Sequence, residues 1–392
     1  MALPLDGVRV LDLTRLLPGN TCAWLLAALG ADVVKVEDPG AGDYMREFGM
    51  QVQGQGAPHH QVNRAKRSVV LDLKQAAGRE AFERLLDTAD VLVESFRPGV
   101  MQRLGLGPDR ILERRPALVY ASLSGFGATG SLSDLAAHDI NYVALSGLVD
   151  RLGTADGPPV VPPIPVADLV GGAILPALGI VSLLLRARAS GRGGHLDAAM
   201  IEGVTQLPNM VVSDLLAGAA VPGRGRAPHS GGLACYRVYE IADGHVAVGA
   251  LEPKFWAAMC RALGAEELLQ RQHDDDQDAL AADLAAALSG LTRAEVRERF
   301  EGVDACVTVV ASYEEALDSP LAHERGLVRQ APDLPMPVLA PPFVIDGERP
   351  PESGPAPRQG EHSRAVLAEA GLSDEEISTL ESAGITRQAA DT

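Results

Sequence analysis

The sequence has little of several features that mark whole classes of protein. Its four cysteines are widely scattered without a CxxC pair, and no histidines cluster at the spacing of a metal site. We therefore expect a reduced, cytoplasmic protein with no bound metal. Positive charge is also scarce, because 34 Lys and Arg residues stand against 52 Asp and Glu residues, a net charge of −18. The electrostatic field of so negative a protein repels phosphate, which argues against binding to nucleic acid or to an anionic membrane surface.

Membrane and dinucleotide signals are weak as well. Residues 1–14 lack a basic stretch followed by an apolar core, so no signal peptide is expected. The run from Leu169 to Leu185 has no charge, but it holds three glycines and a proline and is at the short limit for a membrane span. We predict a buried helix there. No GxGxxG motif follows the first expected strand, which argues against a nicotinamide-dependent oxidoreductase.

The first half of the chain alternates short apolar segments with segments of helical periodicity, which predicts an α/β fold around a parallel sheet. Strands are expected over residues 7–14, 32–39, 68–73, 89–96 and 116–127. Later, apolar alternation around an Asp243-Gly244 turn predicts a β-hairpin over 235–251 and a smaller second domain. The Gly- and Gln-rich residues 49–61 are expected to form a surface loop, and the Pro-rich residues 334–363 an extended strap.

Polar residues with acid/base chemistry gather in residues 124–173. His138, Asp139, Tyr142 and Asp168 stand there among glycines and small apolar residues. Our working hypothesis is that His138 and Asp168 form an acid/base pair that faces one carbon of a substrate. Asp168 directly precedes the apolar run, so an N-cap is the structural alternative for it. Asp139 has the position of a residue in the first turn of a helix.

Two groups of cations are candidates for a phosphate-bearing ligand, despite the acidic balance of the chain. Arg64, Lys66 and Arg67 directly precede an expected strand, where a solvated basic turn is the alternative. Arg97 lies at the carboxyl end of another strand, which is where parallel sheets bind ligands. The glycine-rich residues 124–130 lack the lysine of a P-loop and favour a tight turn instead.

Several blocks in a fixed order make the sequence similar to the family III CoA-transferase superfamily, and within it to the α-methylacyl-CoA racemases. The blocks are GVRVLDLTRLLPG, GADVVKVEDPG, NRAKRSVVLDL, ESFRPGVMQRLGLG, SGFGATG, AAHDINYVALSG, DAAMIEG and GALEPKFW. The resemblance implies a Rossmann-like large domain and a smaller α+β domain in an interlocked homodimer. The expected ranges are 1–222 for the first part of the large domain, 223–328 for the small domain, and 329–392 for a strap and helix that return to the large domain.

The resemblance also implies a reaction, which is epimerisation of the α-carbon of a 2-methyl-branched acyl-CoA through an enolate. His138 and Asp168 would be the two bases, and Glu252 would partner the histidine. No cofactor is implied, since CoA is part of the substrate. The implied CoA-binding and thioester-binding residues are Lys35, Arg64, Lys66, Arg67, Arg97, Ala137, Asp139, Ile140, Asn141 and Tyr142.

Two other functions remain open on the sequence. One is a CoA-transferase, in which Asp168 would carry the acyl group as a mixed anhydride. The other is a non-catalytic acyl-CoA-binding protein, which would bind without proton exchange. The length and type of the acyl chain stay open in each case.

Overall fold

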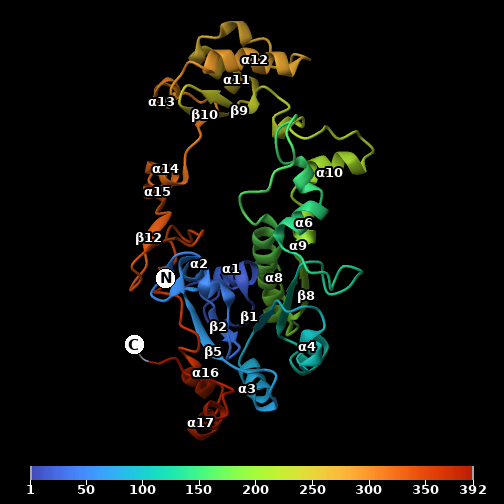
Figure 1. Ribbon diagram of the computed structural model, residues 1–392, viewed down its shortest axis with the longest axis vertical. Helices are drawn as coiled ribbons and strands as arrows, with labels where there is room; N and C mark the ends of the chain where they lie inside the picture. The colour runs from blue at the N-terminus through green and yellow to red at the C-terminus, as the bar shows by residue number, and fades with distance from the viewer. Residues whose placement is uncertain (1, 391–392) are drawn as a thin grey trace. The chain divides into compact units, whose positions relative to one another are not determined.

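The structure, a computed structural model, describes residues 2–390 and divides into two compact units (Figure 1). Unit 1 comprises Met1–Ser146, Pro163–Leu207 and His323–Thr392, and unit 2 comprises Gly147–Pro162 and Pro208–Ala322. Each unit is therefore assembled from separate stretches of sequence. Residues 147–162 and 208–222, which we expected in the large domain, belong to unit 2, and residues 323–328, which we expected in the small domain, belong to unit 1.

A six-stranded sheet is the frame of unit 1, in the order β5-β2-β1-β6-β7-β8, and every neighbouring pair is parallel. Its strands are β1 (Arg9–Leu13), β2 (Asp32–Glu37), β5 (Lys66–Val70), β6 (Val91–Glu94), β7 (Val119–Ser124) and β8 (Gly194–Ala199). In chain order, β2 and β5 are added on one side of β1, and β6, β7 and β8 are then added on its other side. Ligands of such sheets bind beyond the carboxyl ends of the strands, at the reversal of strand order, here between β1 and β6.

Helices cover both faces of this sheet, which confirms the predicted α/β class. On β1, Val10 packs into a core with α1 and α8, while Leu11 packs on the other face with α3, α16 and α17. The helices of unit 1 are α1 (Leu16–Ala28), α2 (Ala57–Asn63), α3 (Ala76–Asp87), α4 (Val100–Arg103), α5 (Pro108–Arg114), α6 (Asp139–Leu145), the π-helix η2 (Ala167–Ile174), α8 (Leu175–Ser190), α9 (Met200–Thr205), α16 (Ser363–Glu369) and α17 (Asp374–Ser382).

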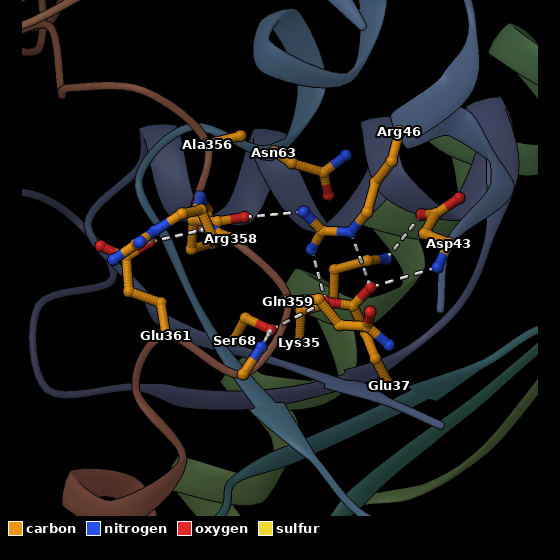
Figure 2. A network of polar contacts seen from close by, with 12 residues as sticks. Lys35, Glu37, Asp43, Arg46, Asn63, Ser68, Ala356, Arg358, Gln359 and Glu361 are labelled. Carbon is orange, nitrogen blue, oxygen red and sulfur yellow. Dashed lines mark hydrogen bonds and ion pairs between the residues drawn. The ribbon is translucent and has the colours of Figure 1, made fainter. Parts of the chain in front are cut away.

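The C-terminal part of the chain packs on the N-terminal part. Figure 1 shows the red helices α16 and α17 below the blue strands, and the Val70 main chain donates to the Ser363 hydroxyl at 3.1 Å. The Pro-rich strap leading to α16 is held by Arg46, which pairs with Glu37 and donates to the Pro357 carbonyl at 2.9 Å (Figure 2). The strap contains little regular structure besides β13 (Pro337–Leu339), which pairs with β12 (Val328–Gln330).

Our prediction of a surface loop over residues 49–61 was wrong. This stretch forms a small hairpin, β3 (Gln51–Val52) and β4 (Gln55–Gly56), followed by α2, and both His59 and His60 are buried. His60 bonds the Val52 carbonyl at 2.9 Å and accepts the Ala356 N–H at 3.1 Å. The strap from the far end of the sequence therefore covers α2, and no local pattern in residues 49–61 contains that information.

The predicted buried helix over 169–185 is only half buried. The segment is η2 running on into α8, and the Leu175 N–H donates to the Val170 carbonyl across the π-turn. Ile180 and Leu184 face the core, but Leu178 is 63% exposed and Leu185 is 73% exposed. By length and composition the stretch Ala167–Ser190 has the properties of a membrane span, and 39% of its most apolar window is buried.

Unit 2 is built on a three-stranded antiparallel sheet, in the order β11-β10-β9. The predicted hairpin is confirmed as β9 (Tyr236–Ile241) and β10 (Gly244–Gly249), and β11 (Val307–Val309) pairs with β10. Helices α11 (Pro253–Leu263), α12 (Gln277–Leu288) and α13 (Arg293–Phe300) pack on this sheet around the buried Trp256. The shorter helices are α7 (Leu148–Arg151), α10 (Asn209–Leu216) and α14 (Tyr313–Leu317), and α15 (Pro320–Arg325) begins in unit 2 and ends in unit 1.

Candidate active site

His138 stands at the start of α6, as its N-cap, in an extended backbone conformation. The main-chain N–H of His138 donates to Asn141 Oδ1 at 3.0 Å, which closes the first turn of the helix. The His138 side chain is exposed on unit 1. Asp139 follows as the first helical residue, as the sequence predicted. The histidine is thus fixed by its backbone, while its ring is left accessible to a ligand.

Asp168 lies inside the first turn of η2, so our alternative of an N-cap is wrong. The N-cap is Val166, and the Pro165 carbonyl already accepts the Leu169 N–H at 3.1 Å, so the helix begins before Asp168. The N–H of Asp168 donates to Asp139 Oδ1 at 2.9 Å. The main chain of Asp168 therefore donates to a side chain of α6, and its carboxyl group does not cap the helix.

The environment of Asp168 favours a protonated carboxyl. Burial raises the pKa of Asp168 to about 6, the nearby Asp139 carboxylate adds to the shift, and His138 opposes it. Burial also raises the pKa of Tyr142, and both carboxylates add to that effect. The structure therefore brings together His138, Asp139, Tyr142 and Asp168, as predicted, and perturbed carboxyl groups of this kind are frequent in active sites.

Tyr142 forms the wall beside this group. It is buried, its hydroxyl donates to the Ala137 carbonyl at 3.2 Å, and its ring meets Phe126 edge to face at 5.1 Å. A Cβ atom on Gly125 would lie 2.3 Å from the Tyr142 hydroxyl oxygen, so this close approach requires glycine. The glycine-rich loop after β7 thus packs against the candidate site, as a tight turn would. Ile140 and Asn141 are exposed on α6.

Lys35 and Lys66, two of the expected CoA ligands, have fully buried side chains. The Lys35 ammonium lies 2.9 Å from Asp43 Oδ2 and donates to Asn20 Oδ1 and to the Thr14 carbonyl. The Lys66 ammonium lies 2.9 Å from a carboxylate oxygen of Asp12. Their role as CoA ligands stays a prediction that these contacts do not support.

Arg64 and Arg67 are also engaged by protein groups. Arg64 is buried above the Trp24 ring, at 4.7 Å from its centroid, and its Nε donates to Glu352 of the strap at 3.3 Å. Arg67 pairs with Asp32 at 2.6 Å and with Glu369 of α16 at 2.8 Å. Both arginines pair with C-terminal segments, Arg64 with the strap and Arg67 with α16, so a role in binding CoA stays a prediction without support from these contacts.

Arg97 differs from the other four cations. It is exposed just beyond the carboxyl end of β6, beside the point where the strand order reverses. Within residues 2–390, no carboxylate forms an ion pair with it. Of the five predicted cations, Arg97 has the position and exposure that a phosphate ligand requires.

Glu252, the third expected catalytic residue, lies in unit 2. It is the N-cap of α11, and its carbonyl accepts the N–H groups of Phe255 at 2.9 Å and of Trp256 at 3.0 Å. Its partnership with His138 of unit 1 stays a prediction. Among the described residues, no group of three or more His, Cys, Asp and Glu side chains has the geometry to hold a metal ion.

Sequence reasoning missed the buried network behind the loop that follows β1. Asp43 accepts the N–H of Leu16 at 3.1 Å, and Leu16 has a φ of +63°, a conformation that is unusual for leucine. Pro18, in the first turn of α1, approaches η2, since a Cβ atom on Gly172 would lie 2.6 Å from the Pro18 Cβ. Strained backbone held by many contacts is common at functional sites. No motif in the sequence marks Asp43 as its anchor.

The chain matches a known protein family in sequence and in structure. The sequence profile described as CoA-transferase family III matches residues 5–363. The chain is 38% identical to "Alpha-methylacyl-CoA racemase" of Mus musculus, over 96% of each chain. It is 34% identical to "Acetyl-CoA:oxalate CoA-transferase" of Acetobacter aceti, over 93% of this chain and 95% of the relative. A crystal structure of a CAIB/BAIF family protein from Brucella suis matches with a TM-score of 0.82 and 27% identity, over 94% of this chain and 100% of that one.

Proposed function

The chain belongs to CoA-transferase family III, and from this membership we propose that it epimerises the α-carbon of a 2-methyl-branched acyl-CoA. The observation that carries the proposal is the half-buried Asp168 beside His138: burial and the Asp139 carboxylate raise the pKa of Asp168 to about 6, while His138 opposes the shift. A carboxyl group with this pKa both takes up and releases a proton near neutral pH.

The proposed reaction moves one proton at a time. One base removes the α-proton from one face of the thioester and leaves an enolate, and the conjugate acid of the other base returns a proton to the opposite face. His138 and Asp168 exchange these roles when the direction is reversed. The enolate oxygen needs hydrogen bond donors. The N–H of Asp168 is already bonded to Asp139, and that of Asn141 donates to the His138 carbonyl at 2.8 Å. The N–H groups of Asp139 and Ile140, at the start of α6, are therefore better candidates than those of η2.

We also propose that two copies of the chain form the active enzyme, as an interlocked homodimer. Large apolar side chains are exposed along η2 and α8 of unit 1, and such surfaces mark interaction sites. They are Ile174, Leu175, Leu178 and Leu185. In this proposal a second copy covers that surface and brings the Glu252 carboxylate to His138, where it orients the imidazole ring. CoA enters as part of the substrate, Arg97 contacts its phosphates, and the enzyme works in the cytoplasm without a cofactor.

A CoA-transferase is the second candidate, because the 34% identical relative from Acetobacter aceti is named as one. In that reaction the Asp168 carboxylate would attack the thioester carbonyl, expel CoA as thiolate, and form an aspartyl anhydride. This route needs Asp168 and does not need His138. A half-buried carboxylate without a capping role suits either reaction, so the two functions are distinguished by experiment.

The experiment is α-proton exchange of each 2-methylacyl-CoA epimer in deuterated water, with wild type, His138→Ala and Asp168→Ala. For the proposed function, wild type introduces deuterium at the α-carbon with loss of configuration, and both variants lose this activity. A chain that lacks exchange but transfers CoA to an added carboxylic acid, with His138→Ala still active and Asp168→Ala inactive, would be a transferase. Trapping of an acyl group by hydroxylamine on Asp168 would support that second outcome.

A further inference from the structure

Asp139 connects the two segments that carry the candidate bases. It follows His138 in the sequence and begins α6, and its carboxylate oxygen Oδ1 accepts the main-chain N–H of Asp168 at 2.9 Å. The sequence had suggested two roles for Asp139, a first-turn residue of the helix and, by resemblance, a residue that binds the substrate. In the structure its side chain also bonds the first turn of η2.

The hydrogen bond that Asp139 accepts from Asp168 positions the start of η2 relative to α6, because the other side of η2 is fixed by close packing. A Cβ atom on Gly171 would lie 2.3 Å from the Met200 carbonyl oxygen of α9, and one on Gly172 would lie 2.6 Å from Pro18. These contacts restrain the middle of η2. At the start of η2, the hydrogen bond that the Asp168 N–H donates to Asp139 Oδ1 ties the helix to α6.

We infer that Asp139 is a positioning residue, whose carboxylate holds the Asp168 carboxyl and the His138 ring in the spacing that two-base proton transfer needs. This inference rests on the proposed function. Misplacement of a reacting group by 1 Å costs up to about 100-fold in rate, so a single hydrogen bond at this point has a large effect on turnover. Substrate binding does not depend on it in the same way, since Asp139 acts through Asp168.

The charge of Asp139 has a second effect on Asp168. After burial, the Asp139 carboxylate is the next cause that raises the pKa of Asp168, and His138 lowers it. Tyr142 of α6 also faces both carboxylates. The other elements packed on η2 carry few titratable groups. They are the buried thiol Cys22 of α1, Arg186 and Arg188 in the last turns of α8, the exposed Glu202 of α9, and His195 and Asp197 of β8.

Two substitutions separate the hydrogen bond from the charge. Asp139→Asn keeps an oxygen that accepts the Asp168 N–H and removes the charge, while Asp139→Ala removes both. Asp134→Asn is the matched control, since Asp134 is an exposed carboxylate on the preceding loop. The readouts are kcat and KM for deuterium exchange from each epimer, measured between pH 4.5 and pH 8.

We expect Asp139→Ala to lower kcat by about tenfold or more with KM within about twofold, because geometry is lost and binding is kept. Asp139→Asn should keep most of kcat and shift the acidic limb of the pH profile to lower pH. The shift should appear in the direction in which Asp168 is the base, since its pKa falls when the neighbouring charge is removed. Equal kcat in wild type and Asp139→Ala, or an unmoved limb in Asp139→Asn, would contradict the inference.

A measurement that needs no turnover separates this inference from the proposed function. In protein labelled with ¹³C at the aspartate carboxyl carbons, one resonance should titrate near pH 6 and be missing in Asp168→Asn. That resonance should titrate at lower pH in Asp139→Asn and be unchanged in Asp134→Asn. Absence of exchange in the wild type would reject the proposed function alone, whereas an unmoved Asp168 titration in Asp139→Asn would reject the role of Asp139 even in an active racemase.

Discussion

Replacement of Lys35 by methionine should destabilise unit 1 strongly while leaving the affinity for acyl-CoA unchanged in the folded protein. Methionine has a similar length and volume, so packing is largely kept, but the Asp43 carboxylate loses its ion pair at 2.9 Å. The acceptors on Asn20 and Thr14 lose their donor as well. Breaking a buried ion pair by removing one partner costs about 3–5 kcal/mol, so we expect a loss of about 4 kcal/mol at pH 7.

The sign of the pH dependence follows from the contacts of Lys35. Burial alone would lower the pKa of Lys35, but Asp12, Asp43 and Glu37 outweigh it and raise the pKa above its usual value. The stabilisation from the charged lysine is therefore fully present at pH 7, and it is lost only when the pH rises through the pKa of the folded state.

The two tryptophans of the chain allow a clean assay. Trp24 lies in unit 1 and Trp256 in unit 2, so urea unfolding of a Trp256→Phe background, followed by fluorescence, reports on unit 1. Lys74→Met is the control, because Lys74 is an exposed lysine of the same unit. Adding Asp43→Asn to Lys35→Met should recover part of the loss, since the unpaired charge is then removed.

The opposite pattern would refute this reasoning. If Lys35→Met left the unfolding midpoint of unit 1 at the wild-type value and raised KM for acyl-CoA many-fold, Lys35 would be a CoA ligand, as the family resemblance implied. That result would contradict the buried ion pair between Lys35 and Asp43.

Three further predictions follow from single contacts. Arg97→Ala should raise KM for acyl-CoA much more than it lowers kcat, and an unchanged KM in steady-state kinetics would exclude a CoA contact. Asp168→Asn should stabilise the protein by about 1 kcal/mol at pH 8 but not at pH 4. Burial raises the pKa of Asp168, so this carboxyl destabilises the folded state only when the pH rises above the pKa that it has in the unfolded chain. Urea unfolding at both pH values checks this. Gly125→Ala should lower kcat, since the added methyl displaces the Tyr142 hydroxyl, and unchanged exchange kinetics would show that Tyr142 does not shape the site.

Much of the fold was readable from the sequence because its signals are local. Strands and helices alternate with periods that the chain shows directly, and the Asp243-Gly244 turn marks the hairpin of unit 2. The same holds for the position of the candidate site. His138 and Asp139 begin a helix by their own local preferences, and the glycines after β7 form the expected turn.

Only the tertiary structure decided which partners the charged groups have. Lys35, Lys66 and Arg64 look like ligand-binding cations in sequence, but their partners come from the segment after β2, from β1 and from the strap, up to 288 residues away. The contact between Asp139 and Asp168 spans 29 residues and depends on where η2 begins. A sequence pattern records the local preference of a residue, whereas burial and ion pairing depend on segments that meet only when the chain folds.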